Sequence, residues 1–424
     1  MAARTRNIAV PDDKDPIKVA HHSELTPRNG TETHRFGMND LSHQHAPGSV
    51  ASGHAVRRRN ALVKYVAASL CVTATALPAP SLGQTAVPDE VSCPACRITS
   101  RTVTVLDGRD EGAIAGPPIT VRLDGRERFW VIDPGELPLV FSPQGRFIAA
   151  VGRIGSGPGE LQQVIDAVPV PGDSVLLLDN GLERATLVMP DLRIGRSIRV
   201  PGVSFQGTVL QWPTAVAVSA RMHTPAQIGW PMHILSLTGG GYVVRSFGAN
   251  GGELRPGDPQ QLNHVLWSTG AGELWSAAVW EYTLIKWDRV GRPLATVTRR
   301  PEWFARPSRP GIGTASTPPP PTIAGISVES GGLLWVFIRV PSRSWRTAWP
   351  SDSRNASEIS TRAIAFDRLY HTVVEVIDPT HGVIARARFE LAIVYPLPDR
   401  RMAVYELGSD GIPQIRILEL RIER

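Results

Sequence analysis

Lysine is almost absent from most of this 424-residue chain, and no apolar run is long enough to span a bilayer. After residue 86 the only lysine is Lys286, which argues against chemistry that depends on several lysines. The main apolar run, Val66–Leu77, falls short of the roughly 20 residues that a transmembrane helix needs. No Gly-x-Ser-x-Gly or His-Glu-x-x-His motif is present, so two common hydrolase signatures are missing as well.

Residues 1–56 show neither helical nor strand periodicity and contain few large apolar side chains. Such a composition cannot bury enough apolar surface to offset the entropy of ordering the chain. We therefore expect a disordered leader, or a start codon assigned too early. Six of the eleven histidines lie in this segment, and their irregular spacing favours a solvated tail over a metal-binding tract.

Residues 57–86 have the order of a secretory signal peptide. Three consecutive arginines, Arg57–Arg59, precede the apolar run, and small residues such as Ala79 and Ser81 follow it. We therefore expect an exported protein, periplasmic or extracellular, with no transmembrane segment after signal cleavage. Arg58–Lys64 matches a twin-arginine signal only weakly, and the sequence does not distinguish the Sec from the Tat export route.

The positive charge of the chain is concentrated in the first 86 residues. They hold ten Lys or Arg and six Asp or Glu, whereas the remainder holds 35 and 33, a net charge of about +2. Nucleic-acid-binding domains carry a basic patch or stripe. The near-neutral remainder therefore predicts no nucleic-acid partner.

Two cysteines, Cys93 and Cys96, remain after signal cleavage, in an N-terminal segment at 87–100. In an exported chain such a close pair predicts a local disulfide. Arg97 stands where haem attachment needs histidine, and no helix signal follows for a thioredoxin-like site. No further zinc ligands are evident nearby. An unpaired role and a redox or metal role remain the alternatives to the disulfide.

Residues 101–424 have the pattern of short strands and tight turns, with no amphipathic helix. An apolar run that ends near an acidic or small polar residue recurs six times, at spacings of about 40 to 70 residues. The copies are Arg128–Asp133, Ser174–Asp179, Thr214–Ser219, Glu273–Val279, Leu333–Ile338 and Met402–Leu407. Most are followed by a strand, a glycine-containing turn and another strand, which is typical of hairpins.

Six such units in series predict an all-β fold, a six-bladed β-propeller of four-stranded antiparallel blades. The expected blades span residues 118–153, 163–201, 206–248, 262–300, 322–389 and 390–422. The last blade has only three strands of its own, and the alternating segment Thr102–Leu106 can supply the fourth. Closing the ring with an N-terminal strand removes two exposed strand edges at once.

The Gly-x-x-Gly-x-Gly-Pro-Gly-Glu-Leu stretch at 152–161 is followed by Gly172-Asp173-Ser174 and a Leu-Leu-Leu-Asp strand. This combination resembles the NHL-type six-bladed propellers of exported bacterial proteins. The resemblance covers roughly residues 100–424 and is strongest in the first two blades. It implies the fold and little chemistry, because most members of that family lack an established activity.

Some six-bladed propellers are calcium-dependent lactonase-type hydrolases, whose metal is held in the central channel by a Glu, two Asn and an Asp. Only four asparagines follow residue 86, and they do not assemble such a site: Asn180, Asn250, Asn263 and Asn355. The sequence therefore predicts no metal, no cofactor and no catalytic residue. A metal-dependent lactonase- or lyase-type enzyme that uses the channel remains the alternative function.

Three insertions interrupt the repeat, at 219–231, 301–321 and 340–369. The first and third connect the second and third strands of a blade, and the second crosses from one blade to the next. In a four-stranded blade these two kinds of connection open on the same face. We therefore expect all three insertions on one face of the propeller.

These insertions contain the residue types that most often anchor interfaces, on loops expected to be exposed. The candidates for partner binding are Trp230, Trp345, Arg346 and Trp349. We predict a monomeric binding or scaffold propeller that recognises a protein or a glycan through these loops. A cap over the channel, or a structural module of a larger assembly, are the alternatives.

N-terminal sequencing of the exported protein should give a first residue between Gln84 and Pro88, because the small residues after the apolar run mark the cleavage region. The unprocessed precursor from the cytoplasmic fraction is the control. Recovery of His21 or His34 in the exported protein would contradict the signal-peptide assignment.

Overall fold

The computed structural model describes residues 83–107, 114–133, 135–211, 213–238, 241–248, 262–307, 313–350 and 364–424. Contacts divide the chain into one unit of Met1–Thr75 and another of Ala76–Arg424, and every described residue lies in the second. The predicted leader and most of the predicted signal peptide therefore lie outside the described residues. Among the described residues, no helix has the length and apolarity needed to cross a membrane.

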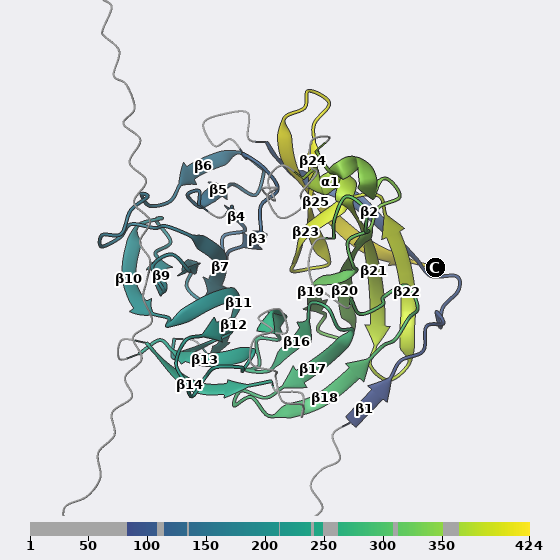
Figure 1. Cartoon of the computed structure of the whole chain (residues 1–424), viewed down its shortest axis with the longest axis horizontal. Coiled ribbons are helices and arrows are strands. Elements are labelled where there is room, and N and C mark those ends of the chain that lie inside the picture. The colour runs from purple at the N-terminus through teal and green to yellow at the C-terminus, as the bar shows by residue number, and fades with distance from the viewer. Residues whose placement is uncertain are drawn as a thin grey trace, which may run out of the picture. The chain divides into compact units, whose positions relative to one another are not determined.

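Six sheets form a ring, and in each the antiparallel strands follow one another in sequence order, except that an N-terminal strand is added at the edge of the fourth and of the sixth sheet (Figure 1). The first two blades are β3 (Thr120–Leu123), β4 (Phe129–Ile132), β5 (Leu139–Phe141), β6 (Phe147–Ala150), then β7 (Val164–Val170), β8 (Ser174–Asp179), β9 (Arg184–Val188), β10 (Ile194–Arg199). The next two are β11 (Gly202–Gln211), β12 (Ala215–Met222), β13 (Met232–Ser236), β14 (Tyr242–Phe247), then β15 (His264–Ser268), β16 (Leu274–Ala278), β17 (Thr283–Trp287), β18 (Pro293–Thr298). The last two are β19 (Thr322–Val328), β20 (Leu334–Pro341), β21 (Tyr370–Asp378), β22 (Gly382–Phe389), then β23 (Ala392–Leu397), β24 (Arg401–Leu407), β25 (Pro413–Glu423) and β2 (Arg97–Asp107). The predicted fold class is confirmed.

The N-terminal strand β2 completes the sixth blade, as predicted. It pairs antiparallel with β25 in a register that runs from Arg97 opposite Glu423 to Asp107 opposite Gln414. Arg101 adds a hydrogen bond from Nε to the Glu419 carboxylate at 2.7 Å. The two ends of the propeller are thus joined within one sheet, and β2 covers the edge that β25 would otherwise expose.

Local features hold the closing strand at both ends. The disulfide Cys93–Cys96, with a Cα–Cα distance of 5.3 Å, lies just before β2. Gly145, in the turn between β5 and β6, has a φ of 82°, and a Cβ there would collide with the carbonyl oxygen of Val105 on β2. Glycine is needed at this turn both for its conformation and for the approach of the closing strand.

A second N-terminal strand, β1 (Gly83–Ala86), pairs parallel with β18 at the edge of the fourth blade. Asp89, a few residues later, forms ion pairs with Arg299, at 2.7 Å, and with Arg386. Both arginines also reach the fully buried carboxylate of Glu375, Arg386 through Nε at 2.6 Å and Arg299 through Nε at 3.2 Å. This cluster ties the segment around Asp89 to the fourth and fifth blades.

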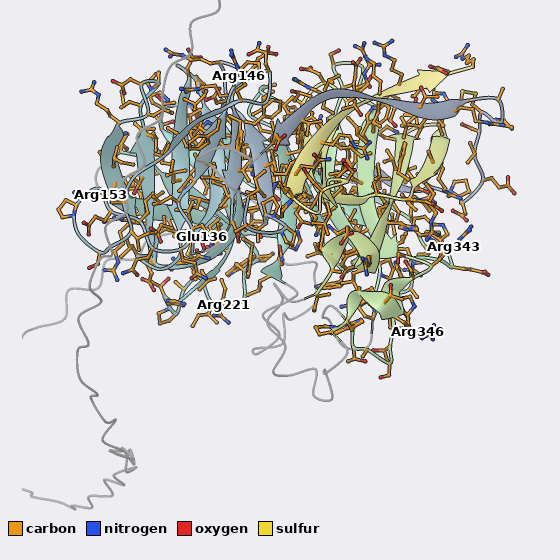
Figure 2. All side chains as sticks on the ribbon, turned by 90° about the horizontal axis from the view of Figure 1, so that it is seen from above. Glu136, Arg146, Arg153, Arg221, Arg343 and Arg346 are labelled. Atoms are coloured by element: carbon orange, nitrogen blue, oxygen red, sulfur yellow. A yellow bond between two sulfur atoms is a disulfide. The ribbon has the colours of Figure 1, made fainter. Side chains whose placement is uncertain are left out.

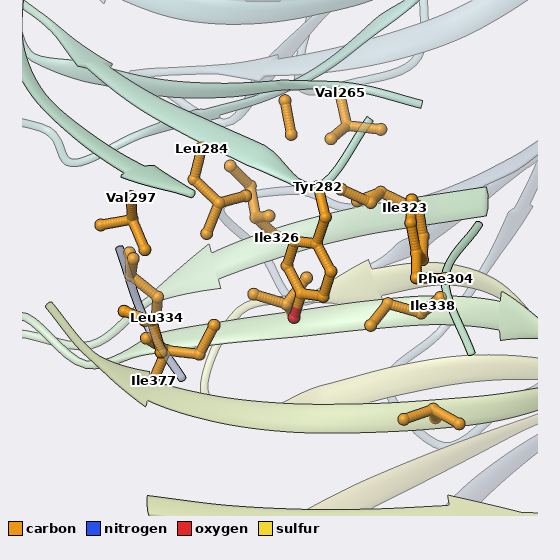
Figure 3. Packing of buried hydrophobic residues seen from close by; sticks show 14 of the residues in the cluster. Val265, Tyr282, Leu284, Val297, Phe304, Ile323, Ile326, Leu334, Ile338 and Ile377 are labelled. Carbon is orange, nitrogen blue, oxygen red and sulfur yellow. The ribbon is translucent and has the colours of Figure 1, made fainter. Parts of the chain in front are cut away.

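Apolar side chains fill the spaces between neighbouring blades. Between the fourth and fifth blades, Leu284, Ile326 and Leu334 pack together with less than 2 % of their surface exposed (Figure 3). The tryptophans of the second strands are buried in the same way, as expected for packing residues: Trp130, Trp275 and Trp335. This burial supplies the main driving force for stacking the blades.

The connections of the blades open on two opposite faces. The long-loop face carries the described parts of the insertions at 223–231, 299–321 and 342–369, and the short-turn face carries tight hairpins such as 142–146 and 288–292. Figure 2 shows Arg221, Arg343 and Arg346 toward one face and Arg146 toward the other.

Deleting residues 97–107 should open the ring, because β25 would become an exposed edge able to pair with other chains. We expect loss of cooperative unfolding and aggregation in size-exclusion chromatography. Deleting residues 83–86 is the control, since it removes only the added strand β1 and leaves the ring closed. A monomeric 97–107 deletion variant with an unchanged melting temperature would contradict the closure.

Candidate functional site

The predicted binding residues lie on the long-loop face in two groups. Trp230 lies in the loop between β12 and β13, and 37 % of its surface is exposed. Trp345 and Arg346 belong to the short 3-10 helix η2 (Trp345–Ala348), and Trp349 follows directly. The two groups come from the third and fifth blades.

Trp345 and Trp349 are buried, at 7 % and 8 % exposure, which corrects the expectation that both lie exposed on the loop. They form a small apolar cluster with Leu369, Tyr370 and Ala392. An insertion with two indole rings gains more by packing them against its own blade and the next than by leaving them in water. Partner binding by these two residues stays a prediction.

The exposed part of the long-loop face has a different composition. Ile228 is 56 % exposed next to Trp230, and the Arg346 guanidinium lies 4.5 Å from the centre of the Trp345 ring. His223, at the base of the same loop, lies 3.1 Å from the Glu183 carboxylate. Apolar, aromatic and charged groups are thus accessible on this face.

A buried ion pair joins the innermost strands of the first two blades. Arg122 on β3 donates from Nε and Nη2 to the carboxylate of Asp166 on β7, at 2.8 and 2.6 Å. Nη2 also donates to the Gly207 carbonyl of β11 at 2.9 Å, and the Gly207 amide donates to Asp166 at 2.8 Å. Burial opposes the charge, but the Asp166 carboxylate raises the pKa of Arg122 above its ordinary value. The ion pair and its hydrogen bonds to Gly207 therefore connect the first three blades, and the two opposite charges neutralise each other.

The network continues to Gln206 and Tyr395. Gln206 exchanges two hydrogen bonds with the backbone of Leu266 on β15, at 3.2 and 2.9 Å, and its Nε2 also donates to the Tyr395 hydroxyl. The Arg122 guanidinium lies 4.3 Å from the centre of the Tyr395 ring. Burial raises the pKa of Tyr395 well above its ordinary value, so the phenol stays protonated. These four side chains and the Leu266 backbone connect the innermost strands of five blades.

Arg122 and Tyr395 of this network lie at the floor of a cavity of about 920 Å³ at the short-turn face, which we call the short-turn cavity. On β3, β7, β11, β15 and β23 the lining residues run from the network to the following turn. The walls are largely apolar, and charged side chains lie at the rim: Glu127, Arg289, Asp399 and Arg401. The geometry suits a small molecule held at the channel mouth.

The histidines outside the leader are distributed over the third, fourth and fifth blades. His233 is buried, with Nδ1 2.8 Å from Ser246 Oγ and Nε2 3.1 Å from the Ala220 carbonyl, and burial lowers its pKa to about 4. It is a neutral packing residue. Across the part of the chain that the structure describes, no three or more His, Cys, Asp or Glu side chains are grouped so as to hold a metal ion.

None of the residues predicted from the sequence belongs to the channel network, although the sequence carries a signal for it. Arg122, Asp166 and Gln206 each interrupt an apolar innermost strand. A buried polar side chain needs a partner, so three such residues in equivalent strands predict one another as partners. The equivalence of the strands does not give the position of each of these side chains along the channel axis. That position decides whether the side chains are close enough to contact one another.

No family model and no curated protein matches the sequence. Among solved structures, a member of the DUF4221 family from Bacteroides vulgatus superposes with a TM-score of 0.54 at 10 % identity, over 78 % of this chain and 99 % of that one. A protein from Bacteroides fragilis described as exported gives 0.50 at 10 % identity, over 80 % and 100 %. A streptogramin B lyase gives only 0.40 at 9 % identity, over 77 % and 98 %, and carries no argument about activity. These likenesses support the propeller fold alone, and the NHL-type assignment stays a prediction.

Replacing Arg122 with Met should lower the free energy of unfolding by about 3–5 kcal/mol, because Asp166 is left as a buried, uncompensated charge. The double change Arg122→Met and Asp166→Asn should recover part of this loss. Guanidinium unfolding of Arg122→Met, of Asp166→Asn and of the double variant measures the coupling energy between the two side chains. Arg193→Met breaks an exposed pair with Asp191 and should change stability little. Strict additivity of the two channel substitutions would show that the pair is not coupled.

Proposed function

We propose that this protein is an exported binding or scaffold propeller that recognises a protein or a glycan through its long-loop face. The observation that carries the proposal is the surface of that face, where Ile228 and Trp230 are exposed and Arg346 lies over Trp345. Exposed aromatic and arginine side chains on loops held by a rigid scaffold are the usual anchors of recognition surfaces.

The burial of Trp345 and Trp349 changes the part that we propose for them. They shape the 342–350 segment and give Arg346 a ring to stack on, so they position the surface from beneath. Arg346 and Trp230 are the residues that we propose contact the partner. Replacing both buried tryptophans should therefore lower stability as well as binding.

The proposal includes an exported location and membership of the NHL-type propellers. The signal-like segment at 57–86, the local disulfide Cys93–Cys96 and the likeness to a protein described as exported support a location outside the cytoplasm. The Gly-rich stretch at 152–161 supports an NHL-type propeller. The metal-dependent enzyme that the sequence left as the alternative gains no supporting observation from the described residues.

Trp230→Ala should weaken partner binding at least about tenfold while leaving the melting temperature unchanged, because a half-exposed loop aromatic contributes more to an interface than to the core. The partner is first captured by placing a photo-crosslinking residue at position 228 in the native host and identifying the cross-linked species. The Kd of each variant for that species is then measured.

Two controls match these substitutions. Tyr242→Ala removes an aromatic residue that is 57 % exposed on the outer strand of the same blade and should leave the Kd unchanged. The crosslinking residue placed at Arg146, on the short-turn face, should capture nothing. A partner captured from position 146 and not from 228 would mean that the long loops are a cap and not the binding surface.

A further inference from the structure

The short-turn cavity is a concave site on the face opposite the long loops. Its volume of about 920 Å³ lies within the range of roughly 300–1,000 Å³ that is typical of small-molecule sites. Each of five blades contributes an apolar side chain to its walls: Leu123, Val168, Val209, Trp267 and Leu397. An apolar molecule that enters would be surrounded on most sides.

The buried charges of this cavity are already compensated within the protein. Arg122 is paired with Asp166. Asp124 accepts hydrogen bonds from Arg128 Nε at 2.7 Å and from Trp130 Nε1 at 2.9 Å. A charged ligand would therefore lose its hydration without gaining a buried partner, which is costly.

The charged side chains at the rim of the cavity also compensate one another. Arg401 and Asp399 pair with each other at 3.1 Å. The two other rim charges, Glu127 and Arg289, are opposite in sign and exposed to water. The rim therefore has no excess charge that would select an anion or a cation.

The floor of the cavity still has a hydrogen to donate. Each oxygen of the Asp166 carboxylate already accepts two hydrogen bonds, from Arg122, Ala167 and Gly207. The Tyr395 oxygen accepts a hydrogen bond from Gln206 Nε2, which leaves the phenol proton to be donated. Because Tyr395 lines the cavity, an acceptor atom of a ligand can receive that proton.

We propose that the short-turn cavity binds an uncharged, apolar small molecule that carries one hydrogen-bond acceptor, such as a carbonyl oxygen. The apolar body lies among Leu123, Val209 and Trp267, and the acceptor meets the Tyr395 hydroxyl on the floor. This site is separate from the long-loop face, so the protein can hold a small molecule and a macromolecule at the same time.

The probe is Prodan, an uncharged naphthalene with one ketone, and its charged counterpart is anilinonaphthalene sulfonate. Fluorescence titration of the full mature chain should show saturable binding of Prodan at one site, and binding of the sulfonate at least about tenfold weaker. Equal or tighter binding of the sulfonate would overturn the inference that the ligand is uncharged. Absence of saturable Prodan binding would overturn the site.

Thr208→Trp places a large side chain in the cavity and should weaken Prodan binding at least tenfold. Val244→Trp is the matched control, because Val244 is 57 % exposed on the outer strand of the same blade. Ala271→Trp, at the exposed rim, fills the mouth without touching the innermost strands and serves if Thr208→Trp does not fold. Prodan binding that survives in a folded cavity-filling variant places the probe elsewhere and contradicts the proposal.

Tyr395→Phe tests the acceptor. It should weaken Prodan binding about five- to tenfold and shift the bound emission to shorter wavelength, because the ketone loses its hydrogen-bond donor. Tyr405→Phe, on the next strand of the same blade, is the control and should change neither. An unchanged emission wavelength in Tyr395→Phe would show that the phenol does not contact the ligand.

Discussion

The pairing of β2 with β25 is the constraint on which the other features of this propeller depend. It joins residues such as Arg101 and Glu419, which are 318 positions apart in the chain. The short-turn cavity takes its walls from five blades, so its shape exists only while the ring is closed. The buried ion pair between β3 and β7 likewise needs the first blade to be held against the sixth as well as the second.

Arginine side chains form the ion pairs with the buried carboxylates of this protein, in keeping with its lysine-poor composition. Three carboxylates with little or no exposure, those of Asp124, Asp166 and Glu375, are each bound by an arginine that holds it through Nε. The guanidinium group is planar and directs its donors in fixed positions, so it can bridge a carboxylate and a backbone carbonyl at once. Arg122 does this across three blades, which makes the channel floor rigid and electrically balanced.

The two faces of the propeller have been elaborated in different ways. On the long-loop face, the 342–369 insertion buries Trp345 and Trp349 in its own small cluster and presents Arg346 above it. On the short-turn face the hairpins stay tight and leave the channel mouth open as a cavity. The proposed macromolecular partner and the proposed small molecule would therefore bind on opposite faces, with the blades between them.

The sequence by itself determined the number of blades, their limits and the closing strand, because period-two alternation and glycine turns are local signals repeated six times. It also determined that Trp130, Trp275 and Trp335 are core residues, since they recur at one position of the repeat. It could not determine whether Trp345 and Trp349 lie in water or against a neighbouring blade, because aromatic content is the same in both cases. Nor could it bring Arg122, Asp166 and Tyr395 together, because their contact depends on how far each innermost strand is shifted along the channel. That shift is decided by the packing of whole blades against one another, which only the tertiary structure contains.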